Sequence, residues 1–220
     1  MKAIILAAGQ CLHLDGYHQL LVRDPKTNNT ILDSYIEIFG ADSITIVVGY
    51  RAIEIMTQYP MLEYVYNREW AVTNNSGSLG LIDITEPSFV LSSDLFISPK
   101  LIAGMTKLKG NVILTALREA RAASAISCFL ENNTVKDIYK GRVKRLTDPE
   151  CLGVFKVDSA KMMSSWIKRC RQYPELFVAE NLPLGGNDVM QNMDLGHEFF
   201  YEINSVNDYI HFLSKRLDRE

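Results

Sequence analysis

Apolar and polar positions follow two different periods along the chain, one typical of buried strands and one typical of amphipathic helices. Residues 3–6 are apolar at every position and lead through two alanines into Gly9. A strand without a polar face suits the centre of a parallel sheet that helices cover on both sides. Residues 31–39 repeat apolar side chains at helical spacing, after Thr30 as a capping residue and before Gly40. The chain therefore opens with a predicted strand, a glycine loop and a helix.

The same two periods predict the remaining elements. We expect strands over residues 43–48, 62–66, 88–92, 111–117, 125–131, 134–139, 152–157 and 198–203, and helices over 51–58, 159–171, 187–193 and 206–217. The first half alternates strand and helix, which favours right-handed βαβ units in a mostly parallel sheet. Consecutive strands in the second half indicate an antiparallel extension. We predict an α/β fold, with a Rossmann-like, mostly parallel sheet flanked by helices, in a single domain over residues 1–220.

Composition and charge narrow the class of protein. The 220 residues are 47% hydrophobic and 22% charged with a formal net charge of −3, so no basic surface argues for a nucleic-acid partner. We recognise no signal peptide, and no stretch approaches the roughly 18 to 20 apolar residues of a membrane span. The four cysteines, Cys11, Cys128, Cys151 and Cys170, lack the paired spacing of a zinc site or a disulfide framework. We expect a cytoplasmic protein that binds neither nucleic acid nor a membrane.

Polar loops after the predicted strands are candidate ligand sites, because ligands of parallel sheets bind at the carboxyl ends of the strands. Gly9 follows the first strand, where exposed backbone N–H groups can hold a phosphate, although a plain strand-to-loop turn also fits. Residues 67–78 form a polar loop after the third strand, and Asp94 follows the fourth. Asp94 also fits a loop or helix-capping acid, and Asn74 and Asn75 also fit turn formers.

The order of several motifs along the chain constitutes a resemblance to a known family. The motifs are Ala3-Ile-Ile-Leu-Ala-Ala-Gly9, Thr73-Asn-Asn75 with Ser78-Leu79, Ser93-Asp94, Gly153-Val-Phe-Lys-Val157 and Glu202-Ile-Asn-Ser-Val-Asn-Asp208. In this order they resemble the nucleotidyltransferase family that activates sugar phosphates and related phosphoesters. The loop from Thr73 to Leu79 is most similar to cytidylyltransferases that act on phosphocholine or phosphonates. The resemblance covers Lys2 to about Phe212, and the order of the motifs is more specific than any one of them.

The resemblance implies a reaction and a set of roles. Such enzymes join an NTP to a phosphate or phosphonate oxygen and release pyrophosphate, so positioning and charge neutralisation by Mg²⁺ and cations dominate over covalent chemistry. The backbone of Leu6, Ala7, Ala8, Gly9 and Gln10 would hold the nucleotide, Asn74, Asn75 and Ser78 would lie near the base and ribose, Asp94 would bind Mg²⁺, and Tyr139 and Lys140 would serve the acceptor. An aromatic side chain there could face a quaternary ammonium, although an isolated aromatic residue also fits the core.

Three charged positions of the family pattern are substituted. His13 stands where the family has an arginine and His18 where it has a lysine, so both positions lose a fixed charge. A histidine with a pKa of about 6.5 is largely neutral at pH 7 unless a bound phosphate raises that pKa. Asn204 replaces a metal-binding aspartate, and an amide is a poorer Mg²⁺ ligand than the carboxylates of Glu202 or Asp208, which could substitute. The candidate catalytic residues are therefore His13, His18 and Asp94, and the candidate metal ligands are Asp94, Glu202 and Asn204.

Three functions remain open at this point. The first is the transfer of CMP from CTP to a phosphocholine- or phosphonate-type acceptor. The second is a sugar-1-phosphate nucleotidyltransferase that uses another NTP. The third is a nucleotide-binding relative with weak or no turnover, for which His13, His18 and Asn204 argue. The expected partners are CTP or another NTP and a small phosphorylated or phosphonate acceptor, and assembly as a homodimer is left open.

Overall fold

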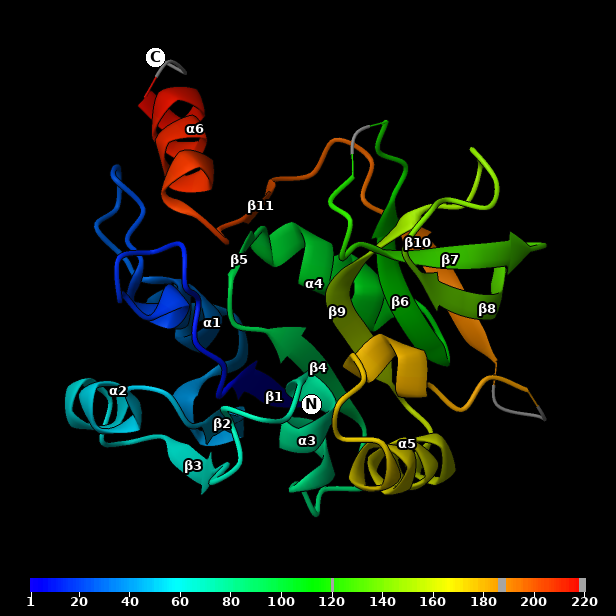
Figure 1. Cartoon of the computed structure of the whole chain (residues 1–220), viewed down its shortest axis with the longest axis horizontal. Coiled ribbons are helices and arrows are strands. Elements are labelled where there is room, and N and C mark those ends of the chain that lie inside the picture. The colour runs from blue at the N-terminus through cyan, green and yellow to red at the C-terminus, as the bar shows by residue number, and fades with distance from the viewer. Residues whose placement is uncertain (120, 186–188, 218–220) are drawn as a thin grey trace.

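A nine-stranded mixed sheet forms the middle layer of the protein (Figure 1). The computed structural model describes residues 1–119, 121–185 and 189–217. The strands of the sheet are β1 (Lys2–Ala7), β2 (Ile44–Val48), β3 (Glu63–Tyr66), β4 (Ser88–Ser92), β6 (Asn111–Ala116), β7 (Ile126–Glu131), β8 (Thr134–Lys140), β9 (Glu150–Val157) and β10 (Met190–Asp194), in the spatial order β3-β2-β1-β4-β9-β6-β10-β8-β7. β1 lies parallel to β2 and β4, whereas β9 is antiparallel to β4 and β6. The predicted parallel core with an antiparallel extension is confirmed.

Helices cover both faces of this sheet. One hydrophobic cluster includes residues of α1 (Ile31–Phe39), α2 (Ala52–Gln58), α4 (Pro99–Lys107) and α6 (Val206–Leu217), and the other includes residues of α3 (Asn75–Gly80), α5 (Ala160–Gln172) and the short η3 (Val178–Asn181). Ala3 and Ile5 of β1 belong to the first cluster and Ile4 and Leu6 to the second, because successive side chains of a strand point to opposite faces. Within the described residues, no helix has the length and apolar character needed to cross a membrane.

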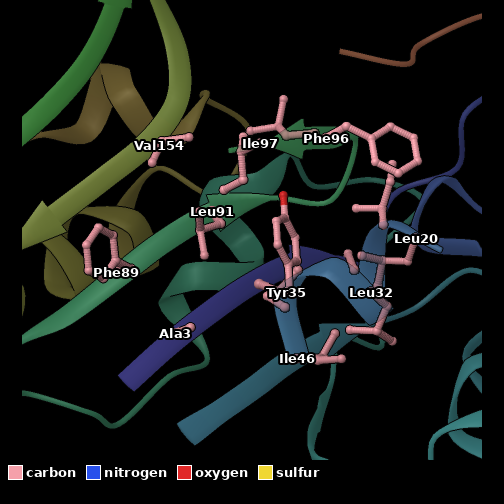
Figure 2. Close-up of a cluster of buried hydrophobic side chains, with 14 of the residues drawn as sticks. Ala3, Leu20, Leu32, Tyr35, Ile46, Phe89, Leu91, Phe96, Ile97 and Val154 are labelled. Carbon is pink, nitrogen blue, oxygen red and sulfur yellow. The ribbon is translucent and has the colours of Figure 1, made fainter. Parts of the chain in front are cut away.

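The packing of α1 fixes the end of β4, where the candidate acid Asp94 follows. Thr30 caps α1 through a reciprocal pair of hydrogen bonds with Asp33, as the sequence pattern predicts. Tyr35 is fully buried between the helix and the sheet, and its hydroxyl donates to the Ser92 carbonyl oxygen at 2.8 Å. Figure 2 shows the Tyr35 ring beside Leu91 with its hydroxyl directed along the sheet. A core side chain thus holds the segment that leads into Asp94.

The two-stranded sheet of β5 (Leu95–Ile97) and β11 (Phe200–Glu202) brings the end of the chain to the turn after β4. β11 is shorter than the predicted strand over residues 198–203, and both β5 and α4 lie outside our predicted elements. The two further 3₁₀ helices are η1 (Gln19–Leu21) and η2 (Ala41–Ser43).

One predicted helix is wrong. We expected a short helix over residues 187–193, but Met190–Asp194 is strand β10, and Asn187 and Asp188 lie outside the described residues. The segment Met-Gln-Asn-Met-Asp lacks an apolar alternation, so its strand character depends on its partners. It pairs in parallel with β6, where Met190 lies opposite Asn111. Long-range pairing therefore overrides the local pattern.

Candidate active site

Two cavities open beside the turn that follows β4. The β1 cavity, of ≈ 440 Å³, includes the loop after β1, and the β9 cavity, of ≈ 730 Å³, includes residues of β9 and of the segment after β6. The residues that line both cavities are Asn75, Ser92, Asp94, Phe177 and Asn204. The cavities are therefore two compartments of one cleft, and Asp94 is a carboxylate common to both.

The loop after β1 supplies one wall of the β1 cavity. Leu6, Ala8, Gly9 and Gln10 line it. A Cβ atom built on Gly9 would meet no atom within 4 Å, so the space in front of this glycine is open. The Ala7 side chain is buried in the hydrophobic cluster on the opposite face of the sheet, and Ala7 does not belong to the lining of the β1 cavity. The other four predicted backbone positions lie together at the cavity.

The opposite wall comes from α3 and the residues before it. Asn74 is the N-cap residue of α3, and Asn74, Asn75 and Ser78 all line the β1 cavity. Asn75 Oδ1 accepts a hydrogen bond from the Val178 backbone N–H at 2.7 Å, and Ser78 Oγ accepts one from Asn67 Nδ2 at 3.3 Å. The three predicted nucleotide positions are thus brought together and held by neighbouring segments.

The two loop histidines lie in different environments. His13 is exposed and lines the β1 cavity. His18 is only 2% exposed, its Nδ1 accepts a hydrogen bond from the Leu20 N–H at 3.1 Å, and its Nε2 donates to the Ala7 carbonyl oxygen at 3.0 Å. Burial lowers the pKa of His18 to about 4, so the ring is neutral at pH 7. Because both ring nitrogens hold the backbone, the expectation that His18 binds phosphate as an imidazolium is wrong.

Asp94 lies between β4 and β5 at the junction of the two cavities. Its Oδ1 atom is buried and has no hydrogen-bond partner among the described residues. Burial, together with the nearby carboxylate of Glu202, raises the pKa of Asp94 to about 8. Burying an ionised carboxylate is costly unless a donor or a cation compensates it. Without a compensating cation, this environment favours the protonated form of Asp94, and a cation bound beside it would stabilise the carboxylate.

The end of β11 brings Glu202 and Asn204 to Asp94. The Ile203 backbone N–H donates to the Asp94 carbonyl oxygen at 2.8 Å and fixes the two segments together. Asn204 Nδ2 donates to Glu202 Oε1 at 2.7 Å, and Asn204 Oδ1 accepts from Gln19 Nε2 at 2.9 Å. The Asn204 amide is thus engaged at both ends and links Glu202 to the start of η1.

These residues fit an Mg²⁺ ion whose remaining coordination positions would be filled by the substrate. Mg²⁺ is commonly held by one or two carboxylates, with waters and substrate phosphates filling the other positions. Asp94 Oδ1 and the Glu202 carboxylate supply that number of protein ligands. In the part of the chain that the structure describes, no group of three or more His, Cys, Asp or Glu side chains is arranged to hold a metal. The ion would therefore depend on the phosphates of a bound nucleotide.

The β9 cavity contains two arginines that our sequence prediction omitted. Arg121 donates to the Ser127 hydroxyl at 3.0 Å and to the Asp148 carbonyl oxygen at 2.6 Å, which fixes its guanidinium. Arg118 Nη1 lies 3.6 Å from both Glu150 Oε2 and Glu202 Oε2. Such planar cations suit a phosphate or phosphonate group, which they can bind through paired hydrogen bonds.

The predicted acceptor residues Tyr139 and Lys140 need correction. Tyr139 is buried, and its hydroxyl donates to Asp148 Oδ2 at 2.6 Å, so it supports the loop before β9. Lys140 is exposed and places its Nζ 4.5 Å from the centre of the Phe177 ring. Neither residue belongs to the linings of the β1 and β9 cavities, although Phe177 borders both. Lys140 therefore contacts Phe177, a residue that borders the cleft.

One sequence signal could have identified Arg118. It follows the strand predicted over residues 111–117, and ligands of such sheets bind at the carboxyl ends of the strands. Glu150 and Gln19 have no comparable local signal, because the residues that they meet are distant in the sequence. Glu150 pairs with Ser127 of β7, and Gln19 Nε2 donates to Asn204 Oδ1.

The chain matches no protein-family model and no curated protein. Solved structures do match it. CTP:phosphocholine cytidylyltransferase from Streptococcus pneumoniae has a TM-score of 0.74 and 20% identity over 97% of this chain and 98% of that one. Inositol-1-phosphate CTP transferase from T. maritima has a TM-score of 0.72 and 16% identity over 99% and 96%, and UDP-glucose pyrophosphorylase complexed with UDP-glucose has 0.73 and 12% over 100% and 99%. These structural neighbours are nucleotidyltransferases, and the chain has their nucleotide-diphospho-sugar transferase fold.

Proposed function

We propose that this chain is a nucleotidyltransferase that transfers CMP from CTP to a phosphocholine- or phosphonate-type acceptor and releases pyrophosphate. The observation that supports this most strongly is the joining of the two cavities at Asp94. One compartment has an open glycine loop and amide side chains, and the other has two arginines beside carboxylates. Two phosphorylated substrates that occupied the compartments would meet at the carboxylate, as transfer between them requires.

The reaction needs few covalent contributions from the protein. A phosphate or phosphonate oxygen of the acceptor attacks the α-phosphorus of the nucleotide, a new P–O bond forms, and the bond to the β-phosphate bridging oxygen breaks as pyrophosphate leaves. The attacking oxygen is already ionised at pH 7, so no general base is required. Catalysis then depends on in-line positioning and on neutralising the charges of the two substrates.

Each wall of the cleft has a role in this scheme. The backbone after β1 and the side chains of Asn74 and Asn75 would bind and orient the nucleotide. Arg118 and Arg121 would hold the acceptor's phosphate group in the β9 cavity. Asp94 and Glu202 would hold Mg²⁺, which when bound neutralises the phosphate oxygens around the reacting centre.

Two alternatives remain. A sugar-1-phosphate nucleotidyltransferase that uses another NTP is supported by the UDP-glucose pyrophosphorylase structure, whose TM-score equals those of the cytidylyltransferases to within 0.01. A relative with weak turnover is supported by the neutral His18 and by Asn204. A thermal-shift comparison of the four NTPs with Mg²⁺ would separate the first alternative, since binding to the folded state raises its stability.

The test of the proposal is pyrophosphate release. CTP with Mg²⁺ would be assayed with phosphocholine, 2-aminoethylphosphonate and a panel of sugar phosphates, and we expect release that depends on both the nucleotide and one acceptor class. A chain that no NTP stabilises, and that releases no pyrophosphate with any acceptor, would contradict the proposal.

A further inference from the structure

The β9 cavity contains a buried carboxylate that lacks a hydrogen-bond donor. Glu150, the first residue of β9, is 8% exposed and lines the cavity. Its Oε2 atom is buried and has no hydrogen-bond partner among the described residues. A buried acceptor left in this state is unfavourable, because it loses its bonds to water without replacing them. A ligand that brings a donor hydrogen to Glu150 would remove that cost.

The ionic neighbour of Glu150 is shared with a second carboxylate. Arg118 Nη1 lies 3.6 Å from Glu150 Oε2 and also 3.6 Å from Glu202 Oε2, both longer than a hydrogen bond. One guanidinium therefore faces two carboxylates. If an acceptor phosphate binds Arg118, as proposed above, the negative charge at Glu150 becomes less compensated. A donor hydrogen elsewhere on the acceptor would then compensate this carboxylate.

Four aromatic residues line the β9 cavity, Phe155, Phe177, Phe200 and Tyr201, and each ring contacts other groups of the protein. Tyr201 packs against Phe199 and Phe212 at 5.3 and 5.0 Å between ring centroids. Lys140 Nζ lies 4.5 Å from the centre of the Phe177 ring, and the Arg118 guanidinium carbon lies 5.7 Å from that of Phe200. The Phe155 ring packs edge-on against Trp166 at 5.1 Å between centroids. A trimethylammonium group is usually recognised by free aromatic faces. This cavity instead contains the Glu150 oxygen that, among the described residues, has an ionic neighbour but no hydrogen-bond donor, and such an oxygen suits a ligand that donates a hydrogen bond.

We propose that Glu150 is a specificity-determining residue that selects acceptors presenting an O–H or N–H hydrogen toward it and discriminates against a fully methylated ammonium. The inference rests on the proposed function for its use in catalysis. A primary ammonium or a hydroxyl can donate to Oε2, whereas a trimethylammonium has no hydrogen to donate and keeps its nitrogen behind methyl groups. Among the acceptors of the proposed function, Glu150 would thus favour a phosphate or phosphonate whose far end bears a primary amine or a hydroxyl over phosphocholine itself.

The test compares phosphorylated ligands whose far ends carry N–H hydrogens, O–H hydrogens or neither. Dissociation constants of phosphoethanolamine, phosphocholine and glycerol 3-phosphate would be measured by calorimetry on the whole chain, with Mg²⁺ and a CTP analogue that cannot be cleaved between its α- and β-phosphates. One hydrogen bond to a buried charged group predicts that phosphoethanolamine binds about tenfold to hundredfold more tightly than phosphocholine.

Two substitutions at Glu150 sharpen the test. In Glu150→Gln the amide oxygen still accepts a bond, so we expect binding of glycerol 3-phosphate to persist while the preference for the primary ammonium falls to a few-fold. In Glu150→Met no acceptor remains, and both preferences should disappear. Glu131→Gln changes an exposed carboxylate at the end of β7 and serves as the matched control. Thermal unfolding of each variant would check that the fold is retained.

The outcomes separate this inference from the proposed function. Equal affinity of the wild type for phosphoethanolamine and phosphocholine, a preference that both Glu150 variants keep, or no binding of any of the three ligands would overturn the role of Glu150. A second outcome is that the chain discriminates between the ligands but releases no pyrophosphate. Glu150 would then remain the selecting residue, and the proposed nucleotidyl transfer would be overturned.

Discussion

The β1 and β9 cavities share Asp94 but differ in the charged side chains that line them. Among the described residues that line the β1 cavity, none is a lysine or an arginine. Apart from Asp94, its polar side chains are mainly amides and hydroxyls with His13, and they lie beside apolar side chains such as Leu12 and Trp70. The β9 cavity contains Arg118 and Arg121 together with Glu150 and Glu202. The β1 cavity includes the loop after β1, whereas the β9 cavity includes residues of β9 and β11, which are separate elements of the chain (Figure 1).

This difference has a direct consequence for the proposed reaction. A nucleoside triphosphate carries more negative charge than the acceptor, yet the compartment proposed for it supplies less positive charge. The triphosphate must then be neutralised by a metal at Asp94 and by backbone N–H groups, whereas the acceptor meets fixed cations. Substitutions at the junction should therefore affect both substrates, and substitutions within one compartment should affect one substrate.

The largest effect is expected at the junction. Asp94→Asn keeps the size of the side chain but removes the charge that favours a cation, so we expect pyrophosphate release to fall by roughly a hundredfold to a thousandfold. Thermal stability at pH 7 should be kept or should rise slightly, because the cost of burying an ionisable carboxyl beside Glu202 is removed. Asp42→Asn, at an exposed position of η2, is the control. Unchanged turnover in Asp94→Asn would remove Asp94 from the reacting centre.

The next effect concerns stability and depends on pH. Burial lowers the pKa of His18 from 6.5 to about 4. Since each pKa unit corresponds to about 1.36 kcal/mol, the free energy of unfolding is about 3 kcal/mol larger with a neutral His18 ring than with a protonated one. The unfolded chain binds a proton near pH 6.5 and the folded chain does not. This stability is thus fully present above pH 6.5 and is lost as the pH falls towards 4.

Urea unfolding at several pH values between 7 and 4.5 would measure this loss. His18→Asn should be less stable at pH 7, because the hydrogen bond to the Ala7 carbonyl oxygen is removed, and its stability should change less with pH. The same change at the exposed His197 is the control. If wild type and His18→Asn lost the same free energy of unfolding between pH 7 and 4.5, His18 would not be the titrating group.

A third effect should be confined to the β9 cavity. Arg118→Met removes the cation that two carboxylates and the acceptor phosphate share, so we expect the acceptor KM to rise about tenfold to hundredfold. The KM for CTP should change by less than a few-fold. Arg118→Lys keeps the charge but not the planar geometry, and should lie between the two. Equal increases in both KM values would show that the compartments do not separate the substrates.

The fold was predictable because its signals are local. The sequence predicted buried strands over residues 3–6 and 88–92, and the structure confirms them. It also predicted that α1 lies between Thr30 and Gly40, which are its two cap residues. β10 was not predictable in the same way, since Gln191 and Asn192 are polar and the strand depends on pairing with β6. Local pattern thus misses strands that long-range pairing creates. Our prediction also omitted α4, although its N-cap residue Ser98 and the following Pro99 are local signals of a helix start.

The candidate site was predictable in position but not in side-chain direction. Gly9, Asn74, Asn75 and Asp94 lie together, as their places after strands indicated. His18 stands where the family pattern has a lysine. A neutral imidazole can donate one hydrogen bond and accept another, and His18 therefore binds two backbone groups inside the protein. Alignment gives the position of a residue, whereas burial decides which groups its side chain contacts.

The smallest effect would come from adding charge to the β1 cavity. His13 lines this cavity, is exposed, and stands where the family resemblance predicts an arginine. His13→Arg would place a fixed cation beside the proposed triphosphate position. A partly solvated ion pair contributes up to about 1 kcal/mol, so we expect CTP to bind about fivefold more tightly at low salt.

The matched control is His197→Arg, which adds the same charge at an exposed position that lines neither cavity. CTP affinity would be measured by calorimetry at two salt concentrations. Since screening weakens exposed ion pairs, the gain of His13→Arg should shrink from low to high salt, and His197→Arg should show little gain at either. Equal gains in the two variants would mean that net charge alone acts on CTP. No gain in His13→Arg would place the triphosphate away from the loop after β1. The nucleotide would then have to be assigned to the β9 cavity and the acceptor to the β1 cavity.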